Sequence, residues 1–128
     1  MLTSPAQGRA APAVLNHEYL AGLQTYLGAA HARELLSDGM IDLAGRLDRL
    51  AELAARGDNG RIATLSHEIV GVAGHLGLGL MSHLAAQASQ AARNGDAAAW
   101  VDTLLEVRAA SIGALRDYCA SHAAGDAA

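Results

Sequence analysis

The sequence contains little that would build a β-sheet, cross-link the chain or cross a membrane. Phe is absent, aromatic residues make up 3%, and the 128 residues include two prolines and one cysteine. Residues that favour strands are therefore few, and an intrachain disulfide is impossible. No apolar run reaches the roughly 18 residues of a membrane span, and the opening MLTSPAQGRAAPAV lacks the charged start and apolar stretch of a secretory signal. We therefore expect an all-α protein of the reducing cytoplasm, without a membrane partner.

Positive charge is also scarce. Lysine is absent, all nine basic residues are arginine, and the formal net charge is −4. A nucleic-acid-binding surface needs a basic surplus on one face, so nucleic acid is not an expected partner. Hydrophobic residues nevertheless make up 52% of the chain. That content excludes an intrinsically disordered protein, and the length supports a single domain.

Ala and Leu, which are abundant, favour helices. Apolar residues recur at spacings of three and four, which is the period of a helix with one buried face. This pattern predicts helices over about residues 17–27, 30–56, 59 to the high 70s, 79–93 and 97–122. In the last of these, Trp100 is expected to anchor the core.

Helix boundaries are marked by capping residues. Asn16 and Asp58 stand where an N-cap is needed, and Gly28 and Gly57 stand where a helix should stop. Residues 1–13 and 123–128 are expected to be flexible tails. Between the tails, over residues 14–122, long helices joined by short turns predict an antiparallel four-helix bundle with a short additional N-terminal helix.

The segment around His67 carries a pattern that a bundle helix does not need. On a helical wheel His67 falls opposite the apolar stripe, and Gly71 and Gly74 fall on the same exposed side. A glycine inside a helix costs about 1 kcal/mol relative to Ala, so two of them on one face need a reason. One reason is to clear space around the imidazole, and the other is close packing of two helices.

Apolar residues border the same face. Val70 and Leu78 fall near His67 on the wheel and are expected to add apolar surface. An exposed histidine surrounded by small and apolar residues is typical of a docking site around a reactive nitrogen.

The stretch HEIVGVAGHLG at residues 67–77 resembles the signature of histidine-containing phosphotransfer (HPt) domains, which reads roughly H-x-L-K-G-[SA]-[SA]-x-x-L-G. The resemblance extends over about residues 16–121. It implies the four-helix bundle fold, with His67 as the phosphorylated histidine and Gly71 as the glycine one turn further on.

The chain departs from the family pattern at Val70 and at two adjacent positions of the next helix. The family usually has Lys where this chain has Val70, and that Lys is thought to help hold the phosphoryl group. The family also tends to carry a Leu followed by Glu or Gln on the next helix, where this chain has Ala88 and Ser89, with Gln90 beside them. Ser89 and Gln90 are therefore the expected binding residues on that helix.

The resemblance also implies the chemistry. As a phosphorelay intermediate, the chain would pass a phosphoryl group through His67, with family precedent for Nε2. Its partners would be response-regulator receiver domains and a sensor histidine kinase, of the ordinary type or of the hybrid type in which a kinase carries its own receiver. The receiver would supply the acceptor Asp and Mg²⁺, so we expect no cofactor or metal in this chain and no enzymatic activity of its own.

Two other functions are compatible with a helical bundle. The chain could bind receivers or kinases as an adaptor without phosphotransfer, and the replacement of the usual Lys by Val70 favours that hypothesis. A metal-binding bundle is the third hypothesis. Its candidate ligands His67, His75 and His83 are spaced eight apart, however, and eight residues advance a helix by about 12 Å, which is too far for one metal ion.

Overall fold

The computed structural model describes the backbone of residues 12–127 and the side chains of residues 12–122. Within that part the chain is helical and contains no strand. The helices are α2 (His17–Leu27), α3 (Ala29–Arg56), α4 (Asn59–His75), α5 (Gly79–Arg93), α6 (Ala98–Glu106) and α7 (Arg108–Ala127). The all-α prediction is confirmed, whereas the expected flexible tail at residues 1–13 lies almost wholly outside the described residues.

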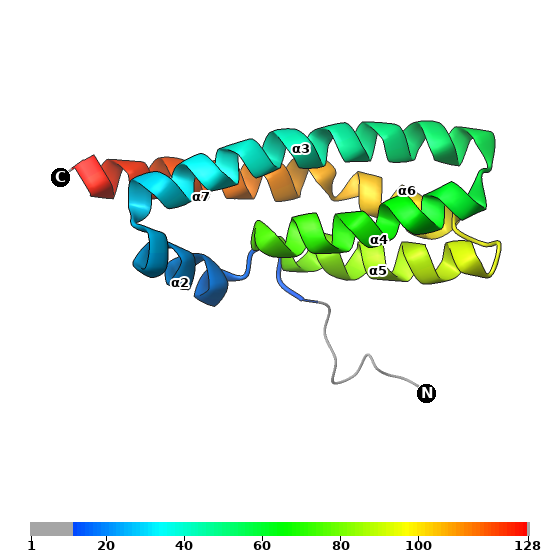
Figure 1. Cartoon of the computed structure of the whole chain (residues 1–128), viewed down its shortest axis with the longest axis horizontal. Coiled ribbons are helices and arrows are strands. Elements are labelled where there is room, and N and C mark those ends of the chain that lie inside the picture. The colour runs from blue at the N-terminus through cyan, green and yellow to red at the C-terminus, as the bar shows by residue number, and fades with distance from the viewer. Residues whose placement is uncertain (1–11, 128) are drawn as a thin grey trace.

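The helices form an antiparallel bundle (Figure 1). α3 runs beside α6 and α7 on one side, and α4 and α5 lie together on the other. α6 and α7 share the fourth position of the bundle, and α2 lies at the end where α3 begins. The predicted four-helix bundle with a short leading helix is therefore confirmed.

The long helix α3 supplies the largest part of the core. Its inward residues are spaced by three and four along one face, as the sequence predicts, and they are Leu36, Met40, Leu43, Leu47 and Leu50. Complete burial of one such side chain stabilises the fold by about 1.5–3 kcal/mol. The same periodicity buries Ile62, Leu65 and Ile69 of α4 against them.

The short helix α2 is held against the end of α4 by two long-range hydrogen bonds. Tyr19 Oη donates to the carbonyl of His75 at 2.8 Å, and the Asn16 amide donates to the carbonyl of Gly77 at 2.8 Å. Gly77 has a φ of +71°, and a Cβ there would lie 2.7 Å from Leu20. Glycine is therefore required at this turn both by the backbone and by the close approach of α2.

Helices α4 and α5 approach closely because small residues line their contact. Ser82 Oγ donates to the carbonyl of Val70, and Ser89 Oγ donates to that of Ala63, both at 2.9 Å. These two bonds fix an antiparallel register in which position 67 of α4 is level with position 85 of α5. The register determines which α5 residues border His67.

The last predicted helix is divided at Val107, and Trp100 does not anchor the core. Ala97, Val101 and Leu104 point inward instead, whereas Trp100 is 38% exposed. The break allows α6 to pack mainly on α5 and α7 mainly on α3. The buried residues Ala97, Val101 and Leu104 are spaced by four and three, which leaves Trp100 at the edge of the inward stripe.

Helix α7 also ends later than expected. The sequence predicts a flexible tail from residue 123, but the helix continues to Ala127. Its last turns extend beyond α4 and α5 and run past the N-terminal end of α3 (Figure 1). Alanine is the strongest helix former, so the Ala-rich end of the chain is compatible with helix.

Candidate functional site

His67 lies in the middle of α4 with its side chain exposed. The residues two positions before and after it, Leu65 and Ile69, are 7% and 0% exposed. The predicted orientation of this helix is therefore confirmed. A histidine whose flanking residues are locked into the core projects from a rigid backbone, which fixes the position of its ring nitrogens relative to the bundle.

The surface around His67 is open. A Cβ added to Gly71 would meet no atom within 4 Å, and one added to Gly74 would meet only Ser82 Oγ, at an ordinary contact distance of 3.7 Å. Both glycines are exposed. Close packing of α4 against its neighbours therefore does not require them, and their shared effect is a face without side chains beside the imidazole.

Helix α5 forms one border of this face. In the register set by the serine hydrogen bonds, Ala86 is an exposed residue almost level with His67, and Val70 is half-buried between the two helices. The sequence analysis did not identify Ala86, because no motif or spacing distinguishes it from the other alanines of α5. Only the pairing of α4 with α5 places it there. Its small side chain leaves the approach to His67 clear from this side as well.

Two of the binding residues expected from the sequence are not available at the surface. Leu78 is fully buried, because α4 ends at His75 and the turn at Gly77 directs the chain into the core. Ser89 is also buried, with its hydroxyl engaged by the carbonyl of Ala63. The prediction for Leu78 is wrong because the wheel of α4 was continued past the end of that helix. The prediction for Ser89 is wrong because the family pattern does not show its contact with α4.

Gln90 is exposed on α5, as a binding residue should be. Its Oε1 accepts a hydrogen bond from Arg93 Nη1 at 3.5 Å. Together with Asn94 and Trp100 it lines a surface hollow of about 260 Å³. The polar end of α5 therefore continues the open face beyond Ala86.

Helix α3 borders the face on the other side with charged groups. Arg46 pairs with Glu68, the residue after His67, and its Nε also lies 3.1 Å from Asp42. This guanidinium is engaged by two carboxylates, and exposed pairs of this kind stabilise a protein by at most about 1 kcal/mol. Position 70, where the resembled family carries a Lys, is occupied by an uncharged Val.

The described residues contain no cluster of three or more His, Cys, Asp or Glu side chains that could hold a metal ion. His75 and His83 are exposed on α4 and α5. None of the described helices has the length and apolar character needed to span a membrane. The chemically distinctive group of this face is therefore the imidazole of His67, which in its neutral form is a nucleophile.

Comparisons with known proteins agree with this geometry. The family model of the Hpt domain matches residues 34–121. Among solved structures, the histidine-containing phosphotransfer protein B (HptB) from Pseudomonas aeruginosa PAO1 is similar with a TM-score of 0.77 and 21% sequence identity, over 84% of this chain and 96% of that one. At that identity the likeness shows a shared fold. None of the curated proteins matches the chain.

Proposed function

This chain belongs to the Hpt domain family, whose members carry phosphoryl groups on histidine in two-component signalling, and we propose that His67 is the residue that performs this step. His67 would accept a phosphoryl group from the aspartate of one receiver domain and donate it to that of another. A sensor histidine kinase, hybrid or not, would feed the same relay. The observation that carries the proposal is an exposed histidine on a rigid helix, with open space along the helix beside it.

The transfer needs little from this chain beyond the imidazole. A lone pair of the ring, on Nε2 by family analogy, attacks the phosphorus of a receiver aspartyl phosphate. The N–P bond forms, the P–O bond breaks, and the electron pair of that bond leaves with the receiver carboxylate. The other ring nitrogen keeps its proton, and the reverse reaction restores the neutral imidazole.

The phosphoryl group must be stabilised chiefly by the partner. Phosphoryl transfer depends on positioning and on neutralising the charge of the phosphoryl oxygens. Val70 supplies no cation, and Arg46 is already engaged by Glu68 and Asp42. Mg²⁺ bound in the receiver would supply that charge, and this chain would act as a carrier and not as an enzyme. We also propose that the protein acts in the cytoplasm. This location suits its proposed receiver partners, and a reducing compartment suits a single unpaired cysteine.

The decisive experiment is transfer of label from a receiver domain phosphorylated on its aspartate. His67→Gln should abolish acceptance, and the purified wild-type product should carry acid-labile, base-stable label. The exposed histidines of the same two helices provide matched controls, since His75→Gln and His83→Gln should accept label like the wild type. Label retained by His67→Gln and lost in one of the control variants would refute the assignment.

The adaptor hypothesis is tested by the same set of proteins. Val70, in place of the cation usual in the family, is the observation that favours it. If the wild type binds a receiver in a pull-down or by calorimetry but never acquires label, the chain is an adaptor. If Val70→Lys then acquires label, the missing cation is the reason.

A further inference from the structure

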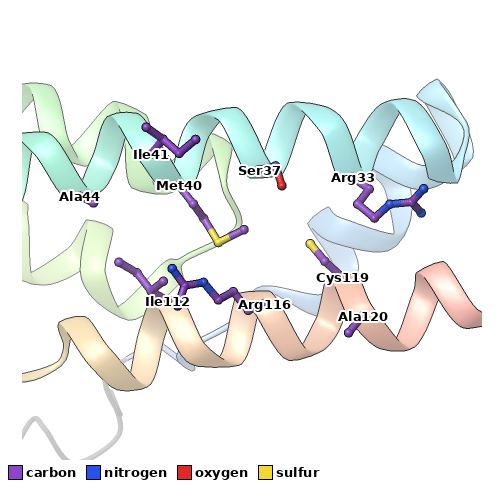
Figure 2. Close-up of a pocket in the computed structure, with 9 residues that line it drawn as sticks. All are labelled: Arg33, Ser37, Met40, Ile41, Ala44, Ile112, Arg116, Cys119 and Ala120. Carbon is purple, nitrogen blue, oxygen red and sulfur yellow. The ribbon is translucent and has the colours of Figure 1, made fainter.

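A second hollow lies on a different part of the bundle, between α3 and α7 (Figure 2). It has a volume of about 480 Å³, within the usual range for small-molecule sites. Met40 and Ile112 form apolar walls, each 8% exposed, and Ile41 lies at the mouth with 75% of its surface exposed. Cys119 of α7 points into the space between the helices.

This hollow does not belong to the His67 face. Helix α3 contacts α4 through Arg46, which pairs with Glu68, whereas it contacts α7 through Asp48, which pairs with Arg108. The lining residues of α3 lie on the α7 side of the helix. A molecule bound here would leave the face around His67 free.

The hollow is an elongated groove between the two helices, partly open to solvent. At one end Arg108 bridges α7 to α3, with hydrogen bonds of 2.7 Å to Asp48 and 3.4 Å to the carbonyl of Ala44. At the other end, beyond Arg33 and Cys119, a separate space of about 10 Å³ borders Tyr118. The α3 residues that line it run from Arg33 to Ala44, about 16 Å along the helix. An extended organic chain matches an elongated groove of this length.

Two cations line this hollow in a chain of net charge −4. Arg33 comes from the α3 wall and Arg116 from the α7 wall (Figure 2). Within the described part of the chain, neither side chain forms an ion pair or a hydrogen bond, whereas Arg46, Arg61 and Arg108 all pair with carboxylates. Unpaired guanidinium groups beside apolar walls match a ligand with an acidic group on an apolar body.

We propose that the hollow between α3 and α7 binds a small, elongated organic acid, with its apolar body against Met40 and Ile112 and its acidic group held by Arg33 or Arg116, whose side chains point apart (Figure 2). The site is independent of phosphotransfer at His67. A ligand that bridges α3 and α7 stabilises the folded bundle, because it binds the native state and not the unfolded chain.

Cys119 provides a site-specific probe, since it is the single cysteine of the chain and lines the hollow. The experiment measures the rate at which a maleimide labels Cys119 in the intact protein, with increasing decanoate as the test ligand. Decanoate should slow labelling at least about fivefold at saturation. Unfolding by the amphiphile would accelerate labelling, so the two effects have opposite signs.

Two further probes separate the parts of the ligand. Acetate carries the acidic group without the apolar body, and decyltrimethylammonium carries the apolar body with the opposite charge. Neither should protect Cys119. Equal protection by the cation would show that the hollow is a non-specific apolar surface, and would overturn the proposal.

The arginines are tested by substitution. Arg33→Gln and Arg116→Gln together should raise the decanoate concentration for half-protection by about five- to tenfold. Arg49→Gln is the matched control, since Arg49 is an exposed arginine of α3 outside the hollow, and it should leave protection unchanged. No protection of the wild type, or undiminished protection of the double variant, would refute the site.

Discussion

Substitution of Gly71 distinguishes a glycine that clears space from one that serves helix packing. The structure leaves the Cβ position at Gly71 empty, with no atom within 4 Å. Gly71→Ala should therefore gain the full helix propensity of alanine without a packing penalty, about 0.8–1 kcal/mol. For a domain of this size, that corresponds to a rise in Tm of about 3–6 °C.

A larger side chain at the same position should separate folding from function. Leu at position 71 would project into solvent beside His67, so the bundle should remain folded with little change in Tm. A receiver domain that docks at His67 would have to approach over this leucine side chain. A penalty of only about 1.4 kcal/mol at the docked surface lowers the transfer rate tenfold, so we expect at least about a tenfold loss with Gly71→Leu.

The control is a glycine of the same kind elsewhere. Gly45 of α3 is exposed, and a Cβ there would also meet nothing within 4 Å. Gly45→Ala and Gly45→Leu should change Tm like the variants at Gly71 but leave transfer intact. Thermal melts by circular dichroism and phosphotransfer assays on all four variants provide the measurement. A large fall in Tm for Gly71→Leu, with the remaining folded protein still active, would show that the glycine serves packing and would refute this interpretation of the face.

Three further predictions concern the bundle. A Cβ at Gly39 would overlap the side chain of Leu76. Gly39→Ala should therefore lower the free energy of unfolding by about 1–3 kcal/mol in urea denaturation. A Gly→Ala change inside a helix usually raises that free energy. The Asp58 side chain accepts a hydrogen bond from the Arg61 amide as the N-cap of α4, and Asp58→Ala should therefore cost about 1 kcal/mol in the same assay. Burial raises the pKa of the Cys119 thiol, with a smaller opposing effect of a nearby arginine. Because the unfolded chain then loses this proton first, the free energy of unfolding should fall as pH rises above the ordinary thiol pKa, and Cys119→Ala should remove that part of the fall.

The sequence by itself determined the helices up to the end of α5 and the orientation of His67, but not the break between α6 and α7. Both follow from local chemistry: a period of 3.6 residues decides which side of α4 is buried, and Asn16, Asp58 and Gly57 satisfy the ends of their helices with groups that lie within a few residues. The exposed position of His67, opposite Ile69, needed no knowledge of the neighbouring helices.

Tertiary structure decided everything that depends on two helices at once. Leu78 was expected at the surface from the wheel of α4 and Ser89 from the family pattern, yet the turn at Gly77 buries the first and the contact with α4 buries the second. Trp100 lies at the edge of the core and not in it, because Val101 and Leu104 are the residues of α6 that point inward. Likewise, Arg33 and Arg116 line the same hollow between α3 and α7, although they are far apart in the sequence. Such relations come from the register of one helix against another, and that register is fixed by side-chain packing and hydrogen bonds between segments, on which a local period carries no information.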